Sequence, residues 1–202
     1  RLGLAVECFH KASLVHDDIE DGDEERYGEP TLHAELGVPV ALNLGDLLLG
    51  EGYRLIGALD APAPVLVEML REAARGHLTL SRGQGAELAW ARAPRPLSSL
   101  EVLAIFREKT APAFEVALRL GAYFAGAPAE VHAVLSAYSE ALGIAYQIAD
   151  DLEDFRAEQG GDLAALRPSL ILAIAHKRAA EGAERALVEA LWRREVAPEA
   201  HR

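Results

Sequence analysis

The chain has 202 residues, half of them hydrophobic, and carries a formal net charge of −12. This length and apolar content predict one globular domain with its own core and exclude a disordered chain. The excess of acidic groups argues against nucleic acid or an anionic membrane as the main partner, so an anionic ligand would need local basic groups or metal cations.

Cys8 is the only cysteine, which excludes an intrachain disulfide and favours a reducing, cytoplasmic compartment. We expect Cys8 to be a small core residue. The apolar runs are far shorter than the roughly 20 residues that a membrane-spanning helix needs, so we predict no integral membrane segment.

Hydrophobic residues recur at helical spacing, while proline, glycine and charge separate the segments. We expect helices over residues 2–21, 39–59, 65–90, about 98–125, 129–155 and 169–193. Ser98 or Ser99 is the expected cap of the fourth helix. Loops are predicted at 22–37, 60–64, 91–96 and 125–128, with another bracketed by 157–162 and Pro168, and the tail after Pro198 is expected to fray. Without strand-like alternation, the pattern predicts a single all-α domain over residues 1–202.

Two clusters share the pattern Asp-Asp-x-x-Asp: "DDIED" at 17–21 and "DDLED" at 150–154. On a helix with about 100° per residue, the three aspartates of each cluster project from one face and repel one another. A solvated helix end explains one such cluster, but two copies after apolar runs favour a metal site. The all-oxygen ligand set, without paired His or Cys, favours Mg²⁺ over zinc.

The ordered motifs resemble those of the polyprenyl synthetases, the trans-isoprenyl diphosphate synthases. "HKASLVHDDIED" at 10–21 and "GIAYQIADDLED" at 143–154 are similar to the family's two DDxxD motifs, and "RYGEPTLH" at 26–33 to the run after the first. In the family's order follow "NLGDLLL" at 43–49, "RGQGAEL" at 82–88, "EKTA" at 108–111 and "DLAALRPSL" at 162–170. The resemblance implies an isoprenoid-synthase-type helical bundle with a central cavity, across which the motifs face each other. Because the family's Gly-Lys-x-x-Arg segment is not in this chain, we expect the domain to be N-terminally incomplete, without its N-terminal helices.

In such enzymes an allylic diphosphate ionises, isopentenyl diphosphate attacks the carbocation through its double bond, and a proton is lost. The departing diphosphate needs electrostatic stabilisation, which Mg²⁺ and basic side chains supply. The resemblance implies isoprenoid diphosphates as substrates, three Mg²⁺ ions with substrate bound, and a homodimer with helix 39–59 as its candidate interface. The implied metal ligands are Asp17, Asp18, Asp21, Asp150, Asp151 and Asp154. The implied catalytic residues are Asp17, Asp18, Asp21, Lys109 and Asp150. The implied substrate-binding residues are His10, Arg26, Gln84, Lys109, Thr110, Gln147 and Arg167.

Several positions depart from the family's pattern. Tyr27 stands where the family has a second arginine, and a tyrosine lacks that residue's charge and bidentate geometry. Glu87 replaces an aspartate, Arg167 replaces a lysine, and the lysine expected after the second motif has no match. The losses fall on phosphate-binding positions, mostly those for isopentenyl diphosphate.

Product length has one indicator in the sequence. In the family, large aromatic residues four and five positions before the first motif stop elongation, and here these positions are Ser13 and Ala12. Their small size favours geranylgeranyl or longer products, although Phe9, one turn deeper, could still stop the chain.

Two alternatives remain beside the prenyltransferase. A diverged class I terpene cyclase or phosphohydrolase would ionise an allylic diphosphate without isopentenyl diphosphate, as Tyr27 and the missing lysine favour. A non-catalytic regulatory subunit of a prenyl synthase is the other, and the complete set of motif aspartates argues against it.

Overall fold

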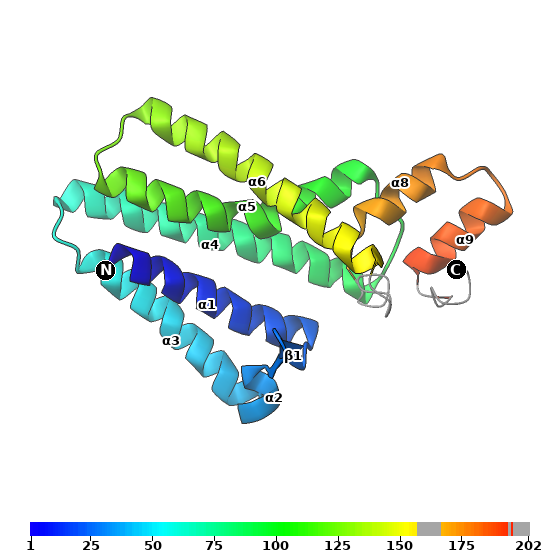
Figure 1. Cartoon of the computed structure of the whole chain (residues 1–202), viewed down its shortest axis with the longest axis horizontal. Helices are drawn as coiled ribbons and strands as arrows, with labels where there is room; N and C mark the ends of the chain where they lie inside the picture. Colours follow the sequence, from blue (N-terminus) through cyan, green and yellow to red (C-terminus); the bar gives the residue numbers. More distant parts are fainter. Residues whose placement is uncertain (157–166, 194, 196–202) are drawn as a thin grey trace. The chain divides into compact units, whose positions relative to one another are not determined.

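The computed structural model of the protein describes residues 1–156, 167–193 and 195, with only the backbone for residues 154–156. The all-α prediction is confirmed, with one very short hairpin as the exception among the described residues (Figure 1). The helices are α1 (Leu2–Asp21), α2 (Leu32–Leu36), α3 (Val38–Gly57), α4 (Ala63–Arg92), α5 (Ser99–Phe124), α6 (Ala129–Arg156), α8 (Leu170–Arg178) and α9 (Ala183–Trp192). Five of the six predicted helices therefore begin and end within about two residues of an observed one.

The chain divides into two compact units, and the boundaries between them fall inside α4, α5 and α6. Unit 1 comprises residues 1–76 and 116–135, and unit 2 comprises residues 77–115 and the described residues from 136 onward. None of the helices in the described part of the chain has the length and hydropathy needed to cross a membrane.

The core of unit 1 forms where α1 packs along α3 and both contact α4 and α5 residues of this unit (Figure 1). Cys8 lies in this core, as predicted, and burial together with the charges of Glu51 and Glu7 raises the pKa of its thiol. Gly52 allows a close approach, because a Cβ there would lie 2.5 Å from the ring of Phe9. The buried members of this core are Ala5, Cys8, Leu55, Ile56, Met69, Ala73, Val116 and Leu120.

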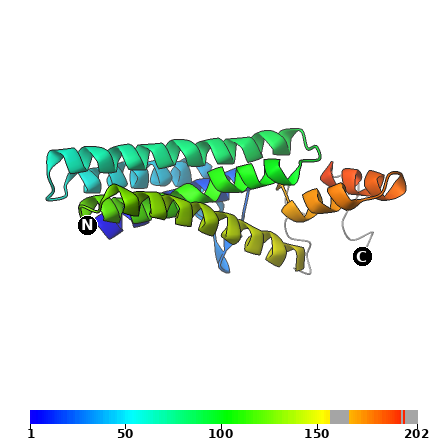
Figure 2. The same cartoon turned by 90° about the horizontal axis from the view of Figure 1, so that it is seen from above.

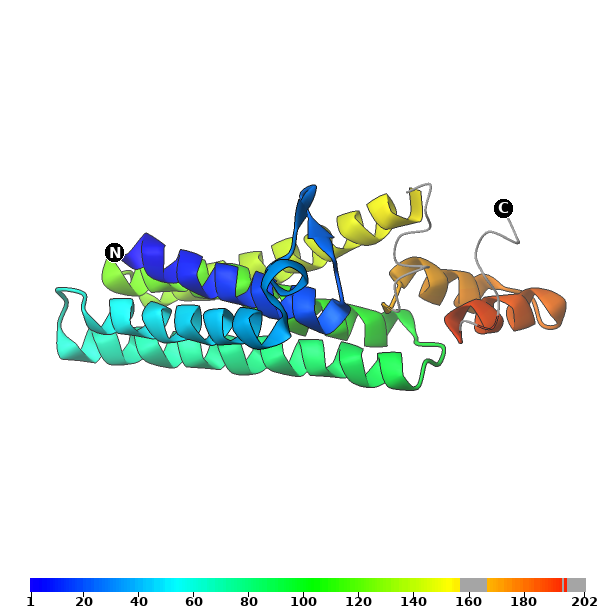
Figure 3. The same ribbon diagram turned by 90° about the horizontal axis from the view of Figure 1, so that it is seen from below.

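The prediction of a plain loop at 22–37 is wrong. The strands β1 (Glu25–Arg26) and β2 (Glu29–Pro30) form an antiparallel hairpin, which Figure 3 shows standing out from the end of α1, and α2 follows it. Tyr27 and Gly28 form the turn with φ angles of 56° and 80°. Two positive φ angles match the type I′ turn that a two-residue hairpin prefers. These strands are too short to leave an alternating pattern in the sequence.

The core of unit 2 centres on a T-shaped pair of tryptophans, Trp90 and Trp192, with ring centroids 5.6 Å apart. Ser98, one of the two predicted candidates, is the N-cap of α5. Its hydroxyl accepts from the Glu101 backbone N–H at 3.3 Å, and the Glu101 carboxylate accepts from the Ser98 N–H at 2.8 Å, which is a reciprocal capping box. The other buried members of this core are Leu97, Val102, Phe106, Leu172 and Ala173.

The prediction of one helix over 169–193 is wrong, because α8 and α9 are separate helices that lie side by side (Figure 2). The backbone becomes extended at Ala179 (φ −58°, ψ 133°), and Gly182 before α9 has a φ of 106°. A residue with a side chain rarely adopts that φ, so the glycine permits the turn. The predicted loop around 157–162 and the tail after Pro198 lie outside the described residues.

Candidate functional site

The first aspartate motif occupies the last turn of α1, which ends at Asp21 with Gly22 in the left-handed conformation. This turn contains no basic residue. Carboxylates at a helix C-terminus oppose the helix dipole, and each such contact is unfavourable by about 0.3–1 kcal/mol. Helix stability therefore does not account for three aspartates here, which indicates a role in binding.

Arg26 of the hairpin reaches back to this motif. Its Nε donates to Oδ1 of Asp18 at 2.6 Å, and its Nη2 lies 3.5 Å from Oδ2 of Asp17. Burial alone lowers the pKa of Arg26, but the hydrogen bond to Asp18 and the charges of Asp17, Asp18 and Asp23 outweigh it and raise that pKa. Asp18 is only 6% exposed, whereas Asp17 and Asp21 are half-buried.

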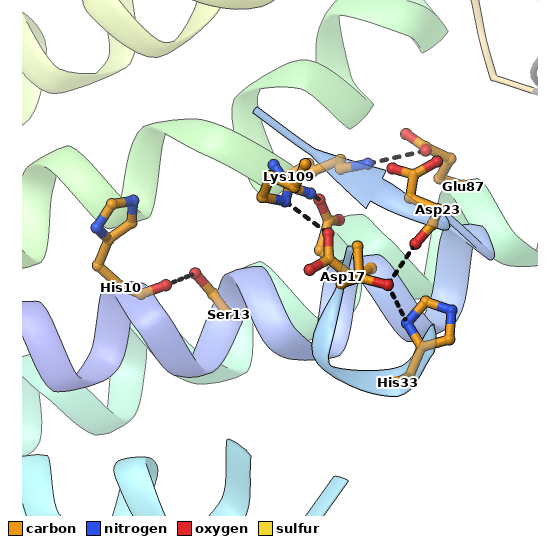
Figure 4. Close-up of polar contacts among 10 residues, drawn as sticks. His10, Ser13, Asp17, Asp23, His33, Glu87 and Lys109 are labelled. Atoms are coloured by element: carbon orange, nitrogen blue, oxygen red, sulfur yellow. Dashed lines mark hydrogen bonds and ion pairs between the residues drawn. The ribbon is translucent and has the colours of Figure 1, made fainter. Parts of the chain in front are cut away.

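Thr31 ties the hairpin to the end of α1. Its hydroxyl donates to the Asp23 carbonyl at 2.8 Å, and its backbone N–H donates to the Glu24 carbonyl at 3.0 Å. The same hydroxyl lies 3.1 Å from Nδ1 of His33 (Figure 4). These contacts fix the segment that carries Arg26 relative to the motif.

Lys109 and Glu87 form a largely buried ion pair in unit 2, with Nζ 2.9 Å from Oε1 (Figure 4). The sequence identified both residues but did not predict that they pair. Gly83 brings α4 against α5 at this point, because a Cβ on it would collide with the Lys109 backbone N. Gln84 is half-buried beside this contact, and neither of its side-chain polar atoms has a hydrogen-bond partner in the described part of the chain. A buried amide needs partners, so Gln84 fits a binding site for a polar ligand.

The second motif lies at the end of α6. Asp151 is 3% exposed, and its carboxylate accepts hydrogen bonds from the Ser169 hydroxyl and the first two backbone N–H groups of α8. Asp150 is half-buried, as is Gln147 one turn earlier. The side chain of Asp154 lies outside the described residues.

Other predicted positions are scattered over the described structure. His10 is half-exposed, with Nδ1 3.5 Å from Glu7, and Ser13 is exposed. Ala12 is fully buried, and Phe9 packs edge-on against Tyr53 with centroids 5.0 Å apart. Thr110 and Arg167 are half-buried.

Ser169 was missed by the sequence reasoning. A serine just before an apolar helical run is a typical N-cap, and this signal could have identified Ser169 as the cap of the helix predicted to begin there. Its link to Asp151 could not be read from the sequence, because 18 residues separate the two.

The positions of the acidic side chains can be compared with the ligands that Mg²⁺ requires. Among the described residues, no group of three or more His, Cys, Asp or Glu side chains is placed to hold an ion by itself. Mg²⁺ in phosphate-binding sites usually takes only one or two carboxylates, with water and substrate phosphates as its other ligands. Asp17 and Asp21, half-buried oxygen ligands one turn apart, fit that requirement.

The family model for polyprenyl synthetase matches residues 1–201. The short chain isoprenyl diphosphate synthase of Methanocaldococcus jannaschii is 29% identical over 202 residues, which cover 96% of this chain and 61% of the relative. The (2E,6E)-farnesyl diphosphate synthase of Mycobacterium tuberculosis is 36% identical over 149 residues, which cover 74% of this chain and 41% of the relative.

The crystal structure of geranylgeranyl pyrophosphate synthetase from Pyrococcus horikoshii matches 91% of this chain and 58% of its own, with a TM-score of 0.82 and 30% identity. The chain thus spans at most about three fifths of the length of these relatives. The helices, the two motifs and these matches agree, and the chain belongs to the polyprenyl synthetase family.

Proposed function

We propose that the protein is a Mg²⁺-dependent prenyltransferase that condenses an allylic diphosphate with isopentenyl diphosphate into a longer trans-polyprenyl diphosphate. The observation that carries the proposal is the presence of a DDxxD motif at the end of α1 and another at the end of α6, in a chain of this family. The relatives named above are synthases of isoprenyl diphosphates, which supports the same substrate class.

The first and last aspartates of each motif are the ones we propose as metal ligands: Asp17, Asp21, Asp150 and Asp154. Mg²⁺ held there would act as a Lewis acid toward the diphosphate leaving group. Asp17 and Asp150 are partly exposed, so a phosphate-bound ion can reach their oxygens without unfolding the helix ends.

Basic side chains supply the remaining positive charge. Arg26 is ionised at any working pH, since its pKa is raised above an already high value, and its guanidinium offers a planar set of donors for a diphosphate. Lys109, held by Glu87, would contact the allylic diphosphate as a point charge. Gln84, with two unsatisfied polar atoms, would donate its amide N–H to a phosphate oxygen. Preorganised groups of this kind stabilise the charge that develops on the leaving diphosphate.

For product length, we propose geranylgeranyl or longer. Ala12 and Ser13 are small, so no aromatic ring stands four or five residues before the first motif. The ring of Phe9 packs against Tyr53 and Gly52. Replacing Ser13 with Phe should shift the product distribution toward shorter chains, as measured by chromatography of the dephosphorylated products. An unchanged distribution would contradict this assignment.

The function is tested by incubating the protein and Mg²⁺ with allylic diphosphates, with and without isopentenyl diphosphate. Elongated products that require isopentenyl diphosphate support the proposal. Asp17→Asn should lower kcat by about a hundredfold or more, because an ion ligand is lost. The matched control is Glu24→Gln, an exposed carboxylate of the same segment, which should retain normal turnover.

A second candidate is favoured by Tyr27, which is 90% exposed and lacks the charge that isopentenyl diphosphate binding would use. A terpene cyclase or phosphohydrolase would release hydrocarbon or alcohol from an allylic diphosphate alone. If the prenyltransferase proposal holds, Tyr27→Arg should lower KM for isopentenyl diphosphate. An allylic diphosphate consumed at equal rates with and without isopentenyl diphosphate, in both forms, would favour the second candidate.

A further inference from the structure

We infer that Asp151, the second aspartate of the second motif, is a positioning residue that anchors α8 to the end of α6 and thereby orients Asp150. The inference rests on the proposed function for its catalytic consequence only. The anchoring itself is a property of the folded chain.

The anchor is a nearly complete cap of α8. Oδ2 of Asp151 accepts from the Leu170 N–H at 2.8 Å and from the Ile171 N–H at 3.1 Å. The Ser169 hydroxyl donates to Oδ1 of Asp151 at 2.8 Å and accepts from the Leu172 N–H at 3.3 Å. Three N–H groups that a helix leaves unpaired at its N-terminus are therefore satisfied by two side chains.

The capping bonds explain why a carboxylate is buried here. Asp151 and Ser169 are both 3% exposed, and Pro168, which precedes Ser169, is fully buried. An ionised carboxylate is tolerated at such a depth when donors and a helix N-terminus compensate its charge. Both oxygens of Asp151 are thus engaged by α8, whereas a metal ligand needs an oxygen that is open to the ion.

The anchor also bears on Asp150. Neighbouring residues on a helix point about 100° apart, so a carboxylate of Asp151 fixed on α8 sets the direction of the half-buried Asp150 beside it. α8 is itself held by Leu172 and Ala173 in the tryptophan core of unit 2. The end of α6 is therefore connected to a packed core through a buried carboxylate.

In the first motif, too, the second aspartate is buried and the first is half-buried. Asp18, its second aspartate, is 6% exposed and accepts from Arg26 of the following hairpin, while Asp17 before it is half-buried. In both motifs, then, the second aspartate is buried, the first is half-buried, and the second binds the segment that follows in the chain.

The anchoring role of Asp151 is tested with Asp151→Asn, Ser169→Ala, their double variant and Ser169→Thr, each in the whole protein. The control is the neighbouring variant Asp150→Asn. Amide hydrogen exchange at Leu170 and Ile171 is measured without metal or substrate. Loss of the cap should speed their exchange about tenfold in Asp151→Asn, and Asp150→Asn should leave it unchanged. Unchanged exchange in Asp151→Asn would overturn the inference whether or not the protein is a prenyltransferase.

Turnover is then measured well below the unfolding temperature of every variant. Asp151→Asn and Ser169→Ala should each lower kcat about tenfold to a hundredfold. The kcat of the double variant should equal that of Asp151→Asn, because both changes remove the same cap. Ser169→Thr keeps the hydroxyl and should have a kcat close to that of the native protein. With Mn²⁺ and inorganic diphosphate as probes, the number of bound ions should fall in Asp150→Asn and stay unchanged in Asp151→Asn. A lost ion in Asp151→Asn with normal kcat in Ser169→Ala would show Asp151 to be a direct ligand.

Discussion

At the scale of single residues, the ion pair with Glu87 sets the position of the Lys109 ammonium group, which we propose as a diphosphate contact. Both side chains are largely buried, with exposed fractions of 16% and 7%. Removing one partner of a buried pair is more harmful than removing a surface charge, since the other charge loses its compensation. Glu87 thus preorganises Lys109 in addition to stabilising the fold.

Replacing Glu87 with Gln tests this role, because the amide keeps the shape and removes the charge. We expect the free energy of unfolding to fall by about 2 kcal/mol. The control Glu108→Gln, next to Lys109 but exposed, should change it by less than about 0.5 kcal/mol. Chemical denaturation followed by circular dichroism measures both, and equal effects in the two variants would contradict the buried pair.

At the scale of elements, glycine spacing on α4 sets how closely α5 approaches. A Cβ on Gly83 would collide with the backbone of Glu108 and Lys109, whereas a Cβ on Gly85 would meet no atom within 4 Å. The first glycine is therefore required by packing, and the second is only a weak point in the helix.

The two glycines are a matched pair for mutation to alanine. Gly83→Ala should destabilise the protein by about 1–3 kcal/mol through overpacking. Gly85→Ala should stabilise it by about 0.5–1 kcal/mol, because alanine has the higher helix propensity. Thermal unfolding distinguishes the two, and effects of the same sign would refute the close contact of α4 with α5.

The cap of α5 predicts a pH dependence. The Ser98 N–H and hydroxyl and the Arg95 guanidinium lower the pKa of Glu101 from 4.5 to about 2. A carboxylate with a depressed pKa in the folded state stabilises the fold fully above pH 4.5 and loses that contribution as the pH falls toward 2. Because Glu101 is 44% exposed, solvent screening keeps the contribution small.

The measurable quantity is the difference in unfolding temperature between the native protein and Glu101→Gln. This difference should be positive at pH 6 and should shrink as the pH is lowered from 4.5 to 2.5. The same substitution at Glu130, in the first turn of α6, serves as control and should not reproduce that trend. A difference that is constant over this pH range would contradict the role of the Glu101 charge.

At the scale of the whole molecule, apolar side chains remain exposed on α3. Val40 and Leu47 are 47% and 65% exposed and lie seven residues apart, on one side of the helix. We propose this face as a homodimer interface, in line with the sequence prediction for residues 39–59.

Sedimentation equilibrium tests the dimer. Leu47→Glu should weaken self-association at least about tenfold, since a charge would be buried at the interface. Leu100→Glu, at a 79% exposed leucine of α5, is the control and should sediment as the native protein does. The proposal that α3 forms the interface would be contradicted if the native protein were monomeric at all concentrations. It would also be contradicted if both variants weakened self-association equally.

Five of the helices and the family could be predicted from the sequence. Periods of 3.6 residues and proline or glycine breaks are local properties, so α1, α3, α4, α5 and α6 could be predicted from them. Aspartate spacing likewise predicted which side chains share a helix face, and the ordered motifs identified the family.

The difference between the first and second aspartates of each motif became visible only in the folded chain. Asp18 and Asp151 are the same residue type as the aspartates that precede them, but Arg26 and Ser169 bind them from positions 8 and 18 residues away. The sequence pattern likewise did not predict the turn at Tyr27 or the helix break at Gly182. Both depend on positive φ angles, which the spacing of hydrophobic residues does not record. Burial and hydrogen bonding between separate segments are what distinguish Asp18 and Asp151 from the aspartates that precede them, and a sequence pattern does not record either property.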